Sequence, residues 1–235
     1  MTLVELAVDD LTATTDAYRR LLARNDSAAE YATSNATLRL DRRHLGHRVL
    51  FDVADVSSWQ TLLERRGLAT RNDATAVQVD GLPVGVTEHR ASGAEAAPNA
   101  CDIEGIDHIV FQAAGRDHAV ALFGSSLGLD FRLDRPVADG LRQLFFRADD
   151  LIVEVLVTPD GVPRTSPPLS LWGIAWATTD IEATQARLTC AGFTVSQVRT
   201  GRKPNTRVAT VRSPALATRT LIIEPTRSVA AKESS

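Results

Sequence analysis

Short apolar runs and amphipathic helical segments alternate along the chain in a pattern that recurs four times. The four predicted strands that open each repeat are "LVELAV" (3–8), "RVLFDV" (48–53), "HIVFQA" (108–113) and "GIAWAT" (173–178). A helix follows each of them, and further strand-like runs span 140–148, 150–157, 206–213 and 219–226. The recurring unit is therefore predicted to be strand–helix–strand–strand–strand, with a first copy too short to hold its last hairpin.

The ends of the predicted helices carry recognisable signals. Ser57 and Thr179 are each followed three positions later by Gln or Glu, which is typical of a capping box at a helix start. Gly67, Gly128 and Gly192 each precede an apolar residue, as expected where a helix ends in a left-handed residue. These signals predict helices after three of the four opening strands with defined first and last turns.

One such unit forms a small, mostly antiparallel sheet with a helix on one face, so its other face needs cover or a ligand. We therefore expect an α+β fold in which tandem βαβββ modules, the first of them shortened, pair into two half-barrel domains. The stretch 89–102 is rich in Ala, Gly and Ser and lacks apolar periodicity, so it is predicted to be a linker. The expected boundaries are 1–88, 103–226 and a disordered tail at 227–235.

Composition narrows the class of protein. The formal net charge is -3, and acidic and basic residues are interleaved, which argues against a nucleic-acid partner. No apolar run reaches the roughly 18 residues of a membrane span, and the acidic N-terminus differs from a signal peptide. Cys101 and Cys190 lie in separate segments without metal-type spacing. We expect a cytoplasmic protein, a monomer or homodimer, whose partner is a small molecule.

Three polar residues interrupt apolar strands: His108 in "GIDHIVFQ", Glu154 in "LIVEVL" and Glu224 in "LIIEP". By strand alternation, His108 shares a face with Gln112. A carboxylate between Ile, Val and Leu is costly to bury without a partner. A shared cation is one such partner. The alternative is an arginine on a neighbouring strand, for which the sequence offers Arg142, Arg147, Arg207 and Arg212.

The second half of the chain resembles the vicinal oxygen chelate superfamily, which includes glyoxalase I, the fosfomycin and bleomycin resistance proteins, methylmalonyl-CoA epimerase and the extradiol dioxygenases. The resemblance is carried by "IDHIVFQ", "AVALFGSSLGLDF", "DLIVEVL", "GIAWATTDIEATQARLTCAGFTV" and "LIIEP". In that family, side chains from the first and last strands of paired units converge on one divalent metal, which binds adjacent oxygens of the substrate.

The resemblance implies His108, Glu154 and Glu224 as metal ligands, with Gly173 at the fourth position. Such a His-Glu-Glu set suits Mn, Mg, Ni, Zn or Fe. Glu154 or Glu224 would also act as the catalytic base. Because Gly173 stands where an extradiol dioxygenase has its second histidine, that activity is disfavoured. No comparable set is found in the first half, which is predicted to be degenerate, and His44 and His47 are expected in an exposed turn.

Two functions remain open. The first is a glyoxalase-like, metal-dependent enzyme of the isomerase or lyase type that acts on a small oxygen-rich molecule. The second is a metal-free protein that binds or sequesters a small molecule, as the bleomycin-resistance proteins do. In either case the expected pocket residues are Gln112, Gly173, Ala175, Arg202 and Lys203. The basic stretch "RTGRKPNTRV" (199–208) either closes over an anionic group or is a solvated hairpin loop.

Overall fold

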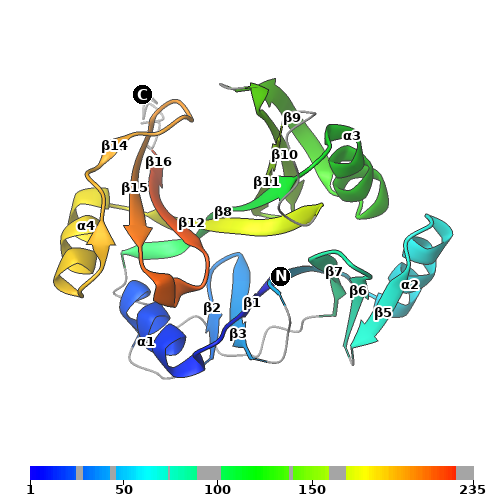
Figure 1. The fold of residues 1–235 in the computed structure, drawn as a ribbon, viewed down its shortest axis with the longest axis horizontal. Coiled ribbons are helices and arrows are strands. Elements are labelled where there is room, and N and C mark those ends of the chain that lie inside the picture. Colours follow the sequence, from blue (N-terminus) through cyan, green and yellow to red (C-terminus); the bar gives the residue numbers. More distant parts are fainter. Residues whose placement is uncertain are drawn as a thin grey trace, which may run out of the picture.

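The computed structural model describes residues 1–24, 29–42, 46–73, 75–88, 102–137, 140–158 and 168–225. Except for Asp102, the predicted linker at 89–102 lies outside these ranges, as do the predicted tail and His44. In the described part of the chain, the strands form two mixed sheets (Figure 1). None of its helices is both long and apolar enough to cross a membrane.

The N-terminal sheet is built from two of the repeated units. Its strand order is β2-β3-β1-β4-β7-β6-β5, and its central pair β1–β4 is antiparallel. The elements are β1 (Thr2–Ala7), α1 (Leu11–Leu21), β2 (Glu30–Ala32), β3 (Ala36–Asp41), β4 (Arg48–Asp52), α2 (Val56–Arg65), β5 (Thr70–Asp73), β6 (Ala76–Val79) and β7 (Val84–Thr87). Two described strands follow α1 and three follow α2, which confirms the shortened first module.

The C-terminal sheet repeats this plan with order β13-β15-β16-β12-β8-β11-β10-β9, and β14 pairs with β15. The first of its units contains β8 (Ile103–Ala113), α3 (Arg116–Ala119), the π-helix η1 (Val120–Ser126), β9 (Asp130–Pro136), β10 (Arg142–Ala148) and β11 (Leu151–Val157). The second contains β12 (Leu169–Thr178), α4 (Ile181–Cys190), β13 (Thr194–Val195), β14 (Arg199–Thr200), β15 (Thr206–Arg212), the 3-10 helix η3 (Pro214–Leu216) and β16 (Arg219–Pro225). The predicted α+β class with two half-barrels is confirmed.

The predicted C-terminal ends of the helices are confirmed, whereas the predicted N-terminal capping residues are wrong. Gly67, Gly128 and Gly192 have φ of 81°, 71° and 87°, the left-handed conformation expected after a last turn. The capping residues at the helix starts are Asp55 and Asp180, whose carboxylates accept first-turn backbone N–H groups. Ser57 and Thr179 are therefore not the N-caps. Aspartate caps as well as serine does, so a nearby Asp makes the capping-box pattern ambiguous.

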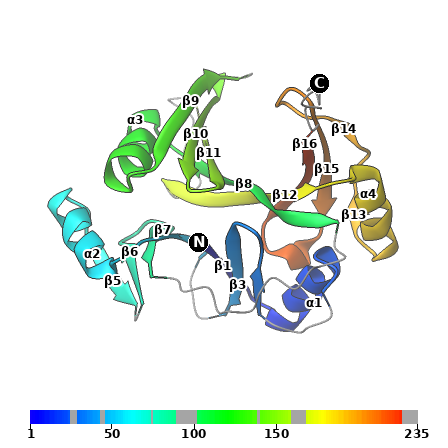
Figure 2. The same ribbon diagram turned by 180° about the vertical axis from the view of Figure 1, so that it is seen from behind.

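The N-terminal sheet packs against the convex side of the C-terminal sheet, so the C-terminal concave face points away from it (Figures 1 and 2). Helix-side residues of both sheets belong to one hydrophobic core. Within this core Tyr18 of α1 contacts Trp176 of β12, with ring centroids 6.3 Å apart. The Tyr18 hydroxyl donates a hydrogen bond to the Leu216 carbonyl at 3.0 Å. The two halves are therefore joined through buried side chains.

Candidate active site

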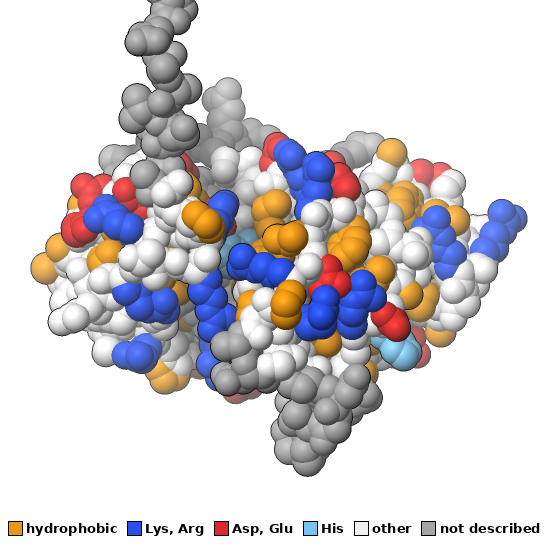
Figure 3. Space-filling model, turned by 90° about the horizontal axis from the view of Figure 1, so that it is seen from above, with side chains coloured by type: hydrophobic (Ala, Val, Ile, Leu, Met, Phe, Trp, Pro, Cys, Tyr) orange, Lys and Arg blue, Asp and Glu red, His pale blue; other side chains and the backbone are white. Residues whose placement is uncertain are grey.

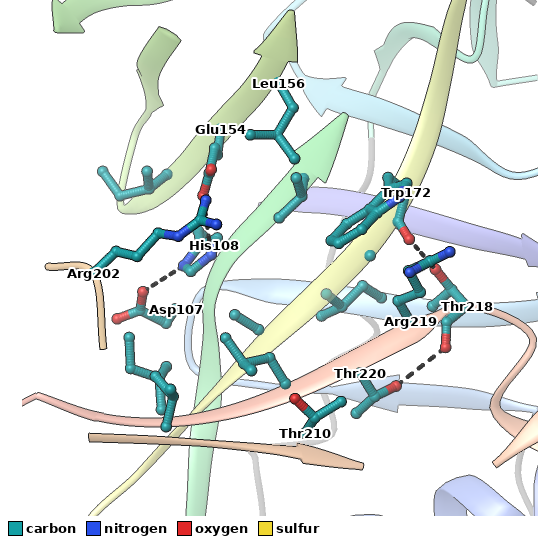
Figure 4. A pocket seen from close by; sticks show the side chains of 18 of the residues that line it. Asp107, His108, Glu154, Leu156, Trp172, Arg202, Thr210, Thr218, Arg219 and Thr220 are labelled. Atoms are coloured by element: carbon teal, nitrogen blue, oxygen red, sulfur yellow. Dashed lines mark hydrogen bonds and ion pairs between the residues drawn. The ribbon is translucent and has the colours of Figure 1, made fainter. Parts of the chain in front are cut away.

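A cavity of about 1110 Å³ occupies the concave face of the C-terminal sheet (Figure 4). All of its lining residues lie between positions 107 and 223, so the N-terminal sheet supports this site from behind and contributes no wall. Much of the wall is apolar and comes from Val110, Ile152, Phe145, Leu156, Val208, Leu221 and Ile223. Polar side chains also line the cavity.

His108 of β8 and Glu154 of β11 lie together on the cavity floor. The two strands are parallel neighbours, with Ile152 paired to His108 and Glu154 paired to Val110, so both polar side chains project from the same face. His108 Nε2 is 3.4 Å from Glu154 Oε2, and His108 Nδ1 is 2.7 Å from Asp107 Oδ2. The imidazole therefore lies between two carboxylates, one at each ring nitrogen.

Gln143 of β10 holds the other oxygen of Glu154. Its Nε2 donates to Glu154 Oε1 at 2.5 Å, and its Oε1 accepts a hydrogen bond from Arg135 Nε at 2.9 Å. Because arginine can only donate, the amide oxygen must face Arg135, and the amide nitrogen must face the carboxylate. Glu154 is 8% exposed and is thus oriented by fixed partners within an apolar strand.

Asp107 is ionised more readily than an ordinary aspartate. Burial opposes its ionisation, but the hydrogen bond and charge of His108, together with the charge of Lys203, hold the pKa below its usual value. A carboxylate at Nδ1 favours a proton on that nitrogen and leaves Nε2 directed at Glu154. Asp107 adjoins His108 in the sequence, yet sequence reasoning missed it, as it missed Gln143 and Arg135. The available signal for Gln143 was a polar residue within the apolar run of β10, whereas Asp107 lies at a register irregularity of β8 that alternation does not predict.

Glu224 does not join this cluster, so that part of the predicted ligand set is wrong. Strand β16 pairs with β12 so that Leu221 lies opposite Ala175, whose own partner is His108. Leu221 and Ile223 therefore face the cavity, and Ile222 lies in the main core. Glu224 projects toward the start of α4. There its Oε2 accepts hydrogen bonds from the Ile181 backbone N–H at 2.9 Å and from Arg207 at 2.6 Å.

The strings "LIVE" and "LIIE" are nearly identical, but they place their glutamates on opposite faces. The alternative partner considered from sequence, an arginine, is the one that Glu224 has. Asp180, Glu182 and Glu224 bring three carboxylates within 4.8 Å of one another, the one group of metal-ligating type found among the described residues. Arg207 already forms ion pairs with Glu182 and Glu224 at this place. The positive charge of Arg207 therefore already balances part of the negative charge of these three carboxylates.

Most of the predicted pocket residues do line the cavity. Gly173, Ala175, Arg202 and Lys203 all line the cavity, whereas Gln112 does not. Gln112 shares the face of His108 but lies beyond the cavity end, opposite Ser170. A Cβ at Gly173 would lie 2.9 Å from the Arg219 carbonyl oxygen, so this position has no room for a side chain. His47, predicted in an exposed turn, instead accepts a hydrogen bond from the Ala7 backbone N–H.

The residues that remain provide two of the three predicted metal ligands. Two donor atoms that bind one ion at about 2.0–2.2 Å lie roughly 3.0–3.5 Å apart, and the 3.4 Å between His108 Nε2 and Glu154 Oε2 falls in that range. A catalytic zinc site ordinarily has three protein ligands. With Glu224 on the other face and glycine at position 173, the described residues bring two of the three predicted ligands together.

Basic side chains outnumber acidic ones around the cavity. The basic residues are Arg132, Arg135, Arg199, Arg202, Lys203, Arg212 and Arg219, and the acidic ones are Asp107 and Glu154. Figure 3 looks onto the face where the cavity opens and shows Lys and Arg side chains among hydrophobic ones. Sequence reasoning identified only two of these cations. The others come from separate strands, and folding brings them to one place.

Comparisons with known proteins support the fold. No protein-family model matches the sequence, and no curated protein matches it. A solved fusion of a xylose isomerase-like TIM barrel with 4-hydroxyphenylpyruvate dioxygenase superposes with a TM-score of 0.68 at 13% identity, over 97% of this chain and 49% of that chain. A mutant of 4-hydroxymandelate synthase from Streptomyces coelicolor gives 0.66 at 11% identity, over 95% of this chain and 90% of that chain.

Methylmalonyl-CoA epimerase from Mycobacterium tuberculosis covers 54% of this chain and 91% of its own, with a TM-score of 0.47 and 17% identity. The chain spans about half the length of the fusion protein and nearly all of the synthase. The order of the strands, the paired modules and the two full-length superpositions lead to one conclusion: this chain has the fold of the vicinal oxygen chelate superfamily.

Proposed function

We propose that the C-terminal cavity is the active site of a small-molecule isomerase or lyase in which Glu154 and His108 move a proton. The observation that carries this proposal is the contact between these two side chains on the floor of a large cavity, with Gln143 and Asp107 fixing their orientation. Paired acid–base groups within reach of each other, in a cavity that admits a small molecule, are the arrangement that proton transfer at carbon uses.

In this proposal, Glu154 is the base. Its Oε2 takes a proton from a carbon beside a carbonyl group, and the electron pair of the broken C–H bond moves onto the carbonyl oxygen to form an enolate. Glu154 then passes this proton across the 3.4 Å contact to Nε2 of His108. The imidazolium gives it, on the same side of the substrate, to a second carbon of the delocalised anion in an isomerase or to the departing group in a lyase. Arg202 and Lys203 are the cations on the cavity wall that stabilise the developing negative charge.

A divalent ion shared by His108 and Glu154 is a second candidate, favoured by the 3.4 Å between their donor atoms. Metal analysis of protein purified without chelator tests it, with Glu154→Gln and Glu224→Gln as a matched pair. Under this candidate the metal content falls in the first variant and is unchanged in the second, because Glu224 is bound to Arg207 on the other side of the sheet. Equal metal content in both variants would exclude an ion at this position.

A third candidate is a metal-free protein that only binds its ligand, and the extensive apolar wall of the cavity favours it. An exchange experiment in D₂O separates this candidate from the enzyme. The protein is incubated with a panel of small carbonyl-containing acids, and proton NMR follows loss of the signal from the C–H group beside the carbonyl. The enzyme exchanges at least one compound, and Glu154→Gln reduces the rate by roughly 100-fold or more.

Glu224→Gln serves as the control and should retain the rate of the unmodified protein. If a panel member binds but its exchange is no faster with the unmodified protein than with Glu154→Gln, then the cavity binds its ligand without catalysis. That result would refute the proposed enzyme and leave the binding protein.

A further inference from the structure

Arg202 and Lys203 lie in the loop between β14 and β15, and both line the cavity. The loop is closed by a hydrogen bond from the Gly201 backbone N–H to the Thr206 carbonyl at 2.8 Å. The Thr206 hydroxyl donates to the Lys203 carbonyl at 2.6 Å. A Cβ on Gly201 would collide with that hydroxyl, so the tight closure requires glycine. These bonds fix the backbone of the loop, from which the exposed side chains of Arg202 and Lys203 border the cavity.

These two cations have no salt-bridge partner among the described residues. Figure 4 shows Arg202 reaching toward His108 and Glu154, while Asp107 lies close to the same histidine. Both nearby carboxylates are already engaged, Glu154 by Gln143 and Asp107 by His108. Over the whole lining of the cavity, the seven Lys and Arg residues outnumber the two carboxylates, and a bound anion would offset this excess of positive charge.

The rest of the cavity wall suits an apolar body. Trp172 borders the cavity, with the Arg219 guanidinium 4.6 Å from the Trp172 ring centroid, and Leu156 also lines the cavity (Figure 4). Leu221 and Ile223 of β16 continue this apolar surface, and Ile223 is paired with Val208 near the loop that carries the two cations. A ligand that carried only charge would leave these surfaces in contact with water, whereas an apolar portion would cover them.

We infer that the cavity recognises an amphipathic organic anion, whose carboxylate or phosphate group binds Arg202 and Lys203 and whose apolar body packs against Trp172 and the neighbouring aliphatic side chains. This inference names the ligand class for the proposed active site and rests on that proposal only in placing the ligand in the same cavity. The basic stretch at 199–208, which the sequence alone left open between a solvated loop and an anion site, is thereby assigned to ligand binding.

Two fluorescent probes with the same kind of ring system test the inference. Anilinonaphthalenesulfonate carries a negative charge, and N-phenylnaphthylamine does not. We expect the double variant Arg202→Ala/Lys203→Ala to bind the anionic probe roughly tenfold or more weakly, and to bind the neutral probe unchanged. The control Arg65→Ala/Arg71→Ala removes two exposed charges from the N-terminal half and should leave both affinities unchanged. Inorganic phosphate and acetate, added as competitors, distinguish a phosphate site from a carboxylate site.

The inference is overturned if the anionic probe binds the two double variants equally well, or if the charge-removing variant loses both probes together. Trp172→Ala extends the test, because it should weaken both probes. Glu154→Gln separates this inference from the proposed function. If that variant binds the anionic probe normally while the unmodified protein fails to exchange any bound acid, the enzyme proposal fails and anion recognition stands. If the unmodified protein exchanges a bound acid but the anionic probe binds equally well without Arg202 and Lys203, the enzyme proposal stands and the inference of anion recognition fails.

Discussion

The two sheets differ in what occupies the centre of their open faces. In the N-terminal sheet, the first strands of the two modules bring Glu5 opposite Arg48, and these side chains form a buried ion pair, 2% and 6% exposed. Arg39 and Asp73 extend the network. In the C-terminal sheet, the corresponding strands bring His108 opposite Ala175 and leave a cavity above them.

This difference shows how one module can serve as a support or as a site. Where each charge has an opposite charge within the same sheet, the electrostatic requirement of burial is met internally and no ligand is needed. Where a small residue replaces one member of the pair, space opens and the remaining polar groups face it. We therefore expect acids at these two centres to differ in what they contribute: stability in the N-terminal half and activity in the C-terminal half.

The largest expected effect is on stability in the N-terminal half. Glu5→Ala leaves Arg48 buried without its main partner and should lower the free energy of unfolding by about 3–5 kcal/mol, measured by chemical denaturation. Glu30→Ala, which removes a partly exposed partner of Arg39, is the control and should cost about 1 kcal/mol or less. If Glu5→Ala lowers the free energy of unfolding by no more than the control does, then the buried ion pair does not stabilise the centre of this sheet as proposed.

The opposite outcome is expected at the C-terminal centre. Glu154→Gln keeps the shape of the side chain and should change the free energy of unfolding by about 1 kcal/mol or less. The same substitution should slow proton exchange on a bound acid by roughly 100-fold, followed by NMR in D₂O. If stability falls as far as in Glu5→Ala while exchange is unaffected, the two centres play the same structural part, and the distinction between them is wrong.

The contact between the two halves that involves Asp102 and Arg187 should contribute a stability that depends on pH. Burial opposes the ionisation of Asp102, but the hydrogen bond and charge of Arg187 outweigh it and lower the pKa of Asp102. Arg187 also donates to the Arg20 and Leu21 carbonyls at the end of α1. A carboxyl with a lowered folded pKa stabilises the fold fully above its unfolded pKa of 3.8 and loses that effect as pH falls through the folded pKa.

Asp102→Asn should therefore lower the free energy of unfolding by about 1.5–3 kcal/mol at pH 7. Its stability should also decline less steeply than that of the unmodified protein when the pH falls below about 4. Denaturant titrations at a series of pH values measure both effects. Parallel acid profiles for the two proteins would contradict the role given to Asp102 in this contact.

The smallest expected effect concerns a neutral contact between the same two halves. Tyr18→Phe removes the hydroxyl that donates to the Leu216 carbonyl and keeps the ring packed on Trp176. We expect a loss of about 1 kcal/mol in the free energy of unfolding, with ligand binding in the cavity unchanged. A change in probe affinity in this variant would mean that the N-terminal half influences the cavity as well as supporting it.

Local sequence patterns predicted much of this architecture. The strands opening each module, the shortened first module and the glycines after three helices follow from periodicity and from the backbone freedom of glycine. That His108 and Glu154 share one site was implied by the family resemblance, and the parallel pairing of their strands brings the two side chains to the same face. The helix N-caps did not follow, since Asp55 and Asp180 compete with nearby hydroxyls for the same role.

The sequence by itself determined the repeat, the α+β class and the apolar setting of Glu154 and Glu224. Only the tertiary structure decided which of these glutamates faces the cavity. A strand has two faces, and pairing with β12 places Leu221 and Ile223 toward the cavity and Glu224 toward α4. The position of Gln143 and of the cavity cations near His108 was likewise decided by the folded sheet, because strands distant in the chain meet through backbone pairing that local patterns do not specify.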